Sequence, residues 1–219
     1  MGAVLGVNNI PGDVDGFVAK LSKDTGSLLG SNGERNDTLS SYRLQSSTKA
    51  DDFVRGLCAS PSDQTFIYVA GSSVDTATGN GTHAFLTKLR VADLVPMWTA
   101  HLRAEDPSGA GLPSIVGISC AVTDDDDFVF FTGNVENGGF VTESNISESA
   151  GGTDIFVAKI DGESGAVVFT RQIGSAGDDF VAPGKSLSLK DDGTVIVVGS
   201  SNGQLYGARN TSFSSQFDA

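Results

Sequence analysis

Short stretches in which apolar residues occupy every second position recur along the chain. One covers 156–160, and a Gly-rich turn at 161–165 and an apolar run follow it. This order predicts a β-hairpin. A second hairpin is predicted within 187–198, where an alternating stretch, an Asp-Asp-Gly turn and an apolar run follow one another. No window of a dozen residues combines helical spacing of apolar positions with a lack of Gly and Pro, so we expect no long helix.

Two phrases repeat in the same order at a nearly constant period. The first reads DGFVAKL, HAFLTKL and DIFVAKI, with its Phe at 17, 85 and 156. The second reads FIYVAGSS, FVFFTGNV and VIVVGSSN, with its Gly at 71, 133 and 199. The Phe positions are 68 and 71 residues apart. Two independent markers with one period predict three repeated units, each of four short antiparallel strands.

Repeated four-stranded sheets predict an all-β fold made of β-propeller blades. A single such sheet cannot cover both of its faces, and radial stacking leaves only short, protected edges. A β-sandwich is the main alternative, but it does not require one phrase at a period near 70. The expected blades are 12–73, 74–135 and 136–203; residues 1–11 are expected to end a preceding blade and 204–219 to start a following blade or form a tail.

Three blades are fewer than the roughly 4–8 that close a propeller ring. We therefore expect the remaining blades to come from further sequence, from another chain or from a linear array. The acidic step Asp51-Asp52-Phe53 of the first unit, which returns as Asp178-Asp179-Phe180 in the third, supports the shared plan.

These phrases resemble the SBBP-type β-propeller repeats, which run as an Asp-x-Phe-Val-Ala-Lys-Leu strand, a Gly turn, a Gly-x-x-x-Asp loop and a Val-x-x-Gly strand. The similarity covers most of residues 12–203 and is strongest in the third unit, whereas the second unit lacks the Asp-Asp-Phe step. The resemblance implies a propeller that occurs largely in secreted and cell-surface proteins. It implies no single ligand or activity.

Charge excludes one class of partner. The formal net charge is −13, and no cluster of Lys and Arg offers the positive surface that nucleic acid requires. Apolar runs are strand-sized and far shorter than the roughly 20 residues that cross a bilayer, so this segment is not expected to span a membrane.

Four glycosylation sequons lie in stretches that look like loops, at Asn36, Asn80, Asn145 and Asn210. Their placement predicts a glycoprotein that is extracellular, on the cell surface or in the secretory lumen.

The two cysteines leave three alternatives open: buried thiols, one disulfide, or half-cystines with partners elsewhere. Cys58 and Cys120 each lie 13 residues before the repeated Gly, where the third unit has Ser186. Because equivalent positions on neighbouring blades are normally too far apart for a disulfide, buried thiols are the favoured interpretation.

Candidate sites for chemistry are few. Gly199-Ser200-Ser201-Asn202-Gly203 matches a serine nucleophile elbow, but no helix follows and both histidines precede it, so no catalytic residue and no enzyme activity are predicted. Acidic turn residues are candidate calcium ligands, because carboxylates are hard oxygen donors. They are Asp124, Asp125, Asp126, Asp191 and Asp192. No cofactor other than calcium is predicted, because His83 and His101 stand in unlike sequence contexts and do not suggest a zinc site.

The hypothesis is therefore a non-catalytic structural or protein-interaction module, in which rigid blades hold variable loops toward a protein partner or toward copies of the chain itself. Two alternatives remain: a glycan-binding propeller, for which Trp98 and Tyr42 could stack on a sugar, and a propeller domain of a secreted enzyme whose active site lies outside this segment.

Overall fold

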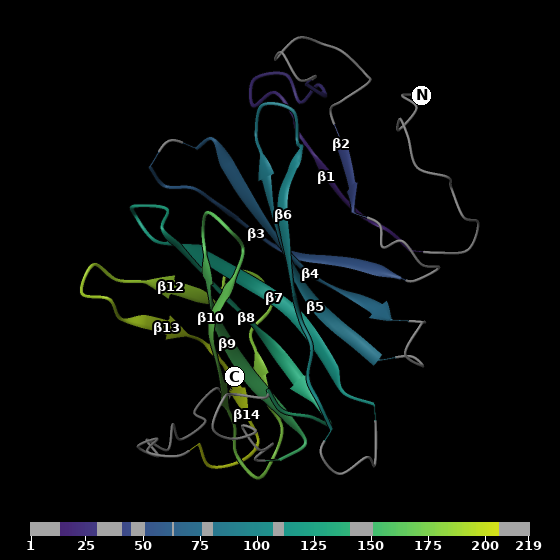
Figure 1. Ribbon diagram of the computed structural model, residues 1–219, viewed down its shortest axis with the longest axis vertical. Helices are drawn as coiled ribbons and strands as arrows, with labels where there is room; N and C mark the ends of the chain where they lie inside the picture. Colours follow the sequence, from purple (N-terminus) through teal and green to yellow (C-terminus); the bar gives the residue numbers. More distant parts are fainter. Residues whose placement is uncertain are drawn as a thin grey trace, which may run out of the picture.

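The computed structural model describes residues 14–29, 41–44, 51–62, 64–75, 81–106, 112–140 and 151–205. Every regular element in these residues is a β-strand, which confirms the all-β class (Figure 1). The same residues contain no helix that is long and apolar enough to cross a membrane. In chain order the strands are β1 (Gly16–Ala19), β2 (Ser41–Leu44), β3 (Asp52–Ala59), β4 (Phe66–Asp75), β5 (Gly81–Arg90), β6 (Pro96–Leu102), β7 (Ser114–Val122), β8 (Phe128–Glu136), β9 (Thr153–Asp161), β10 (Val167–Ile173), β11 (Asp179–Val181), β12 (Leu187–Leu189), β13 (Val195–Val197) and β14 (Gly199–Ser201).

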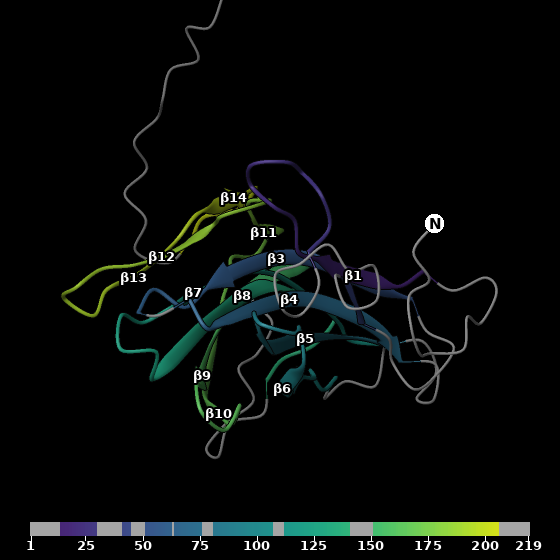
Figure 2. The same ribbon diagram turned by 90° about the horizontal axis from the view of Figure 1, so that it is seen from above.

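Two four-stranded antiparallel meanders form the centre of the molecule. In the first meander β3, β4, β5 and β6 pair in chain order, and in the second β7, β8, β9 and β10 do the same. A single parallel pair, Thr82 with Ser114, links them into one mixed sheet. Figure 2 shows the first strands, β3 and β7, on one side of the molecule and the last strands, β6 and β10, on the other.

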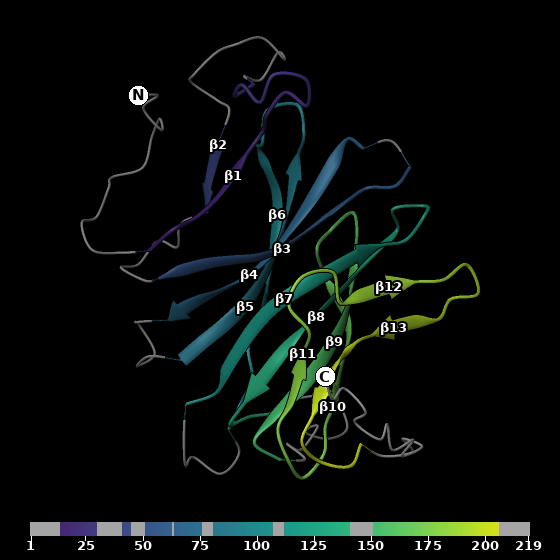
Figure 3. The same ribbon diagram turned by 180° about the vertical axis from the view of Figure 1, so that it is seen from behind.

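A smaller layer lies on each side of the two meanders. The N-terminal hairpin is β1 paired with β2. The C-terminal hairpin is an interrupted ladder in which β11 pairs with β14 and β12 with β13. Figures 1 and 3 show these two hairpins at opposite ends of the molecule, separated by the meanders.

Hydrophobic clusters fill the three spaces between these four layers. The largest lies between the meanders, the second between the N-terminal hairpin and the first meander, and the third between the second meander and the C-terminal hairpin. They include, respectively, Tyr68, Leu86, Phe131 and Phe156; Val18, Val69, Phe85 and Leu89; and Phe130, Val157, Leu187, Val195 and Val197. Because side chains alternate between the two faces of a strand, each meander supplies residues to two clusters.

The repeated Phe and Gly occupy matching positions in the two meanders. Phe85 on β5 pairs with Gly71 on β4, and Phe156 on β9 pairs with Gly133 on β8. A Cβ on Gly71 would lie 2.5 Å from the ring of Phe85, and one on Gly133 would lie 2.8 Å from the ring of Phe156. Only glycine leaves room for the ring of the neighbouring strand.

Phe17, the third copy of this residue, has a different environment. It lies on β1 and pairs with Arg43 on β2, and its side chain is 70% exposed. The repeated phrase therefore forms an equivalent strand in each case, but its burial depends on the neighbours that the strand has.

The sheets are offset by two strands from the units expected at 12–73, 74–135 and 136–203. β4 pairs with β5 across the first boundary, and β8 pairs with β9 across the second. The repeat period gives the length of a unit but does not show which strand is the first of its sheet. Which strands belong to one sheet depends on which consecutive strands pair as hairpins, and these are β3 to β6 and β7 to β10.

Candidate functional site

A groove opens where the first strands of three successive layers approach one another. Its volume is about 720 Å³, and three segments line it: 57–61 at the end of β3, 120–125 at the end of β7, and 185–193 around the turn from β12 to β13. Leu57 at the end of β3 and Leu187 and Leu189 on β12 give the groove apolar surface, and charged side chains from the neighbouring turns line the rest.

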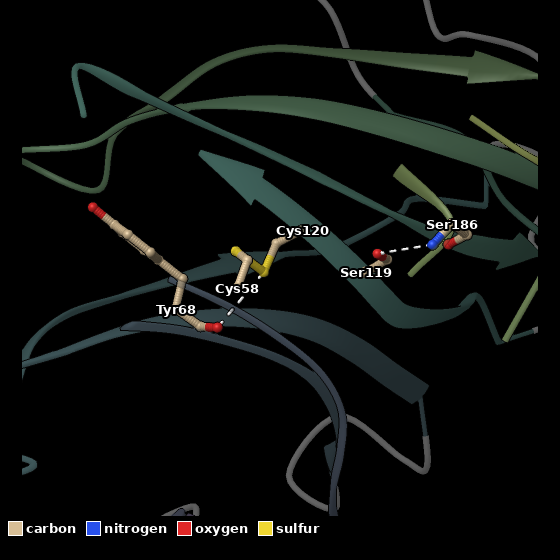
Figure 4. The surroundings of a disulfide bond; sticks show 5 residues. All are labelled: Cys58, Tyr68, Ser119, Cys120 and Ser186. Carbon is tan, nitrogen blue, oxygen red and sulfur yellow. Dashed lines mark hydrogen bonds between the residues drawn. A yellow bond between two sulfur atoms is a disulfide. The ribbon is translucent and has the colours of Figure 1, made fainter. Parts of the chain in front are cut away.

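A disulfide between Cys58 and Cys120 fixes two of these segments to each other, which corrects the interpretation of the cysteines as buried thiols (Figure 4). The Cα atoms are 5.7 Å apart, within the usual range for a disulfide. The Cys120 sulfur is buried and lies 3.6 Å from the carbonyl oxygen of Tyr68. The bond joins β3 of the first meander to β7 of the second.

The error arose because equal spacing in sequence is not equal register in the sheet. Cys58 pairs with Tyr68, three residues before Gly71, whereas Cys120 pairs with Phe131, two residues before Gly133. One residue of shift moves a side chain to the opposite face of its sheet. The two cysteines consequently face each other across the space between the meanders.

Lengths of the hairpin turns explain this shift. The Ser60 N–H donates to the carbonyl of Phe66 across the turn from β3 to β4, and the Thr123 N–H donates to the carbonyl of Phe128 across the turn from β7 to β8. The second turn is one residue shorter than the first. Ser186, expected to match the cysteines, lies in the same region (Figure 4), and its N–H donates to the Ser119 hydroxyl at 3.3 Å.

Carboxylates of the candidate calcium ligands lie on both sides of the groove. Asp124 and Asp125 line it from the end of β7, and Asp191 lines it from the turn after β12. Asp125 accepts a hydrogen bond from the Asp127 N–H at 3.1 Å. Hydrogen bonds from Thr123 and from this amide hold the pKa of the Asp125 carboxyl below its ordinary value.

Asp126 and Asp192 are engaged by their own surroundings. Asp126 has a positive φ of 61° and accepts hydrogen bonds from Ser62 and, at 2.5 Å, from Ser60. Asp192 accepts a bond from the Thr194 N–H and forms an ion pair with Lys190 at 3.5 Å. Hydrogen bonds from Thr194, with a smaller contribution from Lys190, lower the pKa of Asp192.

Over the described ranges, no group of three or more His, Cys, Asp and Glu side chains is arranged to hold a metal ion. Calcium binding by the five turn aspartates therefore stays a prediction from the sequence.

Sequence reasoning missed a histidine pair. His83 on β5 and His101 on β6 lie with their ring centroids 5.0 Å apart, although the two residues stand in unlike sequence contexts. Burial lowers the pKa of His101, the positive charge of Arg103 adds to this effect, and Asp52 opposes it. The pair could have been found from the predicted hairpin of β5 and β6, because His101 pairs with Phe85, two residues from His83 on the same strand.

Two other residues considered for function in the sequence, Ser200 and Trp98, take part in strand pairing or in packing between the meanders. Ser200 lies within β14 and pairs with Phe180 on β11. Trp98 packs against Tyr68 with 5.8 Å between ring centroids, and its indole N–H donates to the carbonyl of Gly162 at 3.2 Å. Trp98 thus joins the two meanders.

Some predictions fall outside the described residues. They include the four sequons at Asn36, Asn80, Asn145 and Asn210. Tyr42 lies on β2, but only its backbone is described.

No protein-family model matches the chain, and a search of curated proteins found no match either.

Proposed function

We propose that this chain is a non-catalytic structural and protein-interaction module of the β-propeller type, and that the groove takes a segment of a protein partner. Stacked layers support the propeller arrangement: each meander packs one face on the preceding layer and the other face on the following layer. The first strands of the meanders lie on one side of the molecule and the last strands on the other (Figure 2). This arrangement agrees with radial stacking, in which the same strand of every blade lies nearest the centre.

The groove is the observation that carries the interaction function. Its volume of about 720 Å³ lies within the range of ligand-binding sites, roughly 300–1,000 Å³. It is built from turns on a rigid base, because the disulfide holds the ends of β3 and β7 together. Turns on a rigid scaffold are where binding specificity is usually placed.

Charge favours a basic partner. Three carboxylates line the groove, from Asp124, Asp125 and Asp191, against two ammonium groups, Lys185 and Lys190. Lys190 is paired with Asp192. The chain as a whole carries a formal charge of −13, which attracts a cationic segment and accelerates its association at low salt.

The same proposal locates the protein in an oxidising compartment, outside the cell or in the secretory lumen. A structural disulfide supports this location, because cytosolic reductants keep most thiols reduced.

Panning a library of displayed peptides against the folded chain tests the groove. We expect enriched peptides to combine Lys or Arg with an apolar residue and to bind more weakly as salt rises. The double variant Asp124→Lys/Asp191→Lys should weaken them about tenfold or more, since it reverses two charges of the groove.

The matched control is Glu105→Lys/Glu163→Lys. It makes the same change in net charge at exposed positions that do not line the groove. Equal weakening by both double variants, or no enrichment of basic peptides, would contradict the proposal. A glycan array on the same protein separates the alternative: saturable binding of a glycan that the groove variant abolishes would favour the lectin-like function.

A further inference from the structure

Among the described residues, each end of the molecule presents half of a sheet. In both complete meanders the second strand pairs with a third strand that carries the repeated Phe. β14, which contains the repeated Gly199, is equivalent to the end of a second strand, and within the described residues it pairs with β11 alone. β1, which contains Phe17, is equivalent to a third strand, and in the same residues it pairs with β2 alone.

The missing contacts at the two ends are complementary. Gly71 and Gly133 lie against the rings of Phe85 and Phe156 on the next strand. A Cβ on any of the three glycines would meet a carbonyl oxygen of the neighbouring first strand, but on Gly199 the nearest side chain would be Ile155, at 3.3 Å, and not an aromatic ring. Within the part of the chain that the structure describes, the C-terminal hairpin thus has a glycine without its aromatic ring, and the N-terminal hairpin has an exposed Phe17.

The C-terminal hairpin exposes apolar residues at positions that are buried in both meanders. Ile196 and Val198 are 43% and 51% exposed. Counted from the repeated Gly, the equivalent residues Tyr68, Ala70, Phe130 and Thr132 are all buried, because a following layer covers them. The outer face of this hairpin has the chemistry of an internal interface.

We propose that two copies of the chain associate head to tail, with β14 of one copy paired antiparallel to β1 of the other. By the register of the meanders, in which Gly71 pairs with Phe85 and Gly133 with Phe156, Gly199 would lie opposite Phe17 of the second copy. Each such pairing completes a four-stranded sheet from two hairpins.

A symmetric pair of chains joined at both ends contains four complete and two composite sheets. Six sheets lie within the roughly 4–8 that close a propeller ring. Closure of the ring rests on the propeller arrangement proposed above, whereas the pairing of β14 with β1 requires only the strand register.

A repeated lysine provides a second contact for the same arrangement. Lys20 donates to the carbonyls of Val91 and Ala92, at 3.2 and 2.8 Å, and the equivalent Lys88 donates to the carbonyl of Gly162 at 2.7 Å. Each lysine therefore reaches the turn between the third and fourth strands of the next layer. Lys159 is the next member of this series, and in the composite sheet the corresponding turn is residues 23–25 of the second copy.

Molar mass across a dilution series, measured by size exclusion with light scattering, tests the association. We expect twice the chain's 22.5 kDa for the full chain. Ser201→Pro should return the mass to that of one chain. Val198 and Asn202 donate their N–H groups to the carbonyls of Ser186 and Asp178, so the N–H of Ser201 points to the opposite edge of β14, away from β11. Proline there blocks pairing and is tolerated at an exposed edge.

Ser201→Ala is the matched control and should stay dimeric, because it keeps the backbone N–H. Asp124→Lys/Asp191→Lys should also stay dimeric, so that failure of the groove proposal and failure of this one remain distinguishable.

Cross-linking tests the register. Two single variants, Val18→Cys and Val198→Cys, are purified separately and mixed under mild oxidation, so that a new disulfide joining them is intermolecular. We expect this cross-link because position 198 would lie opposite position 18. Ile196→Cys replaces Val198→Cys as the control, since it lies on the same face two residues away.

A chain that stays monomeric throughout the dilution series overturns the proposal, and then residues 1–11, which the sequence predicts to end a preceding blade, are the candidate to pair with β1. A dimer that persists in Ser201→Pro and cross-links equally from positions 196 and 198 would also overturn it, because the copies would then be stacked by their faces.

Discussion

Loss of the disulfide between Cys58 and Cys120 should destabilise the protein more than any single change on its surface. The double variant Cys58→Ala/Cys120→Ala removes the link between the two meanders. It leaves the backbone pairing of β3 with β4 and of β7 with β8 in place. The folded structure should therefore survive, and the effect should be on the free energy of unfolding.

The magnitude follows from the length of chain that the bond closes. The two cysteines are 62 residues apart, and closing a loop of that length in the unfolded chain corresponds to about 4 kcal/mol at 25 °C. For a domain of this size each kcal/mol moves Tm by about 2–4 °C, so we expect Tm to fall by about 10 °C. Because Cys120 is buried, its truncation adds a smaller packing loss.

Urea unfolding of three samples measures this effect: the oxidised protein, the protein reduced before unfolding, and the double alanine variant. The reduced protein and the variant should unfold at similar urea concentrations, well below the oxidised protein. Maleimide labelling after denaturation should find no free thiol in the oxidised protein. Two labelled thiols in protein purified without reductant, or a stability difference below about 1 kcal/mol, would refute the reasoning.

Three further outcomes are expected from single positions. Phe156→Ala should cost about 3–5 kcal/mol in urea unfolding because the ring is fully buried, whereas Phe17→Ala should change the stability of the monomer little because that ring is 70% exposed. Gly133→Ala should cost about 3 kcal/mol or more, since its Cβ would lie 1.9 Å from a backbone oxygen, while Gly193→Ala meets no atom within 4 Å and should cost only about 1 kcal/mol for its positive φ. The Arg90 side chain hydrogen-bonds to Asp93 and lowers the pKa of that carboxyl to about 2, so its contribution to stability should be present above pH 4 or so and be lost as pH falls through about 2. Carboxyl NMR titration should show this pKa return toward 3.8 in Arg90→Gln, and an unchanged value would contradict the assignment.

Much of the fold could be predicted because the signals are local. Alternation and turn residues predicted the hairpin that contains Phe156 and the hairpin within 187–198, and both pairings are present. The repeated Phe and Gly predicted equivalent strands, and they pair with each other in both meanders. The hairpins depend on residues a few positions apart and the equivalent strands on a repeated phrase, and the sequence displays both directly.

The features that could not be predicted depend on contacts between layers. The disulfide required knowing that the two hairpin turns differ by one residue, which moves Cys120 to the face opposite to that of Cys58. The histidine pair required the pairing of β5 with β6 in a particular register. The groove combines three segments that are each about 65 residues apart, so no local pattern contains it.

The groove and the two ends are separate consequences of one repeat. First strands of neighbouring layers meet on one side of the molecule, and their turns form a groove whose base is held by a covalent bond. Phe17 and Val198 are exposed, whereas the residues at equivalent positions in the inner layers are buried because a neighbouring layer covers them. In stacked repeats stability is a sum over units and their interfaces. If the proposed association and the proposed partner binding both hold, a change at the ends alters how many layers stack, and a change in the groove alters which segment is bound.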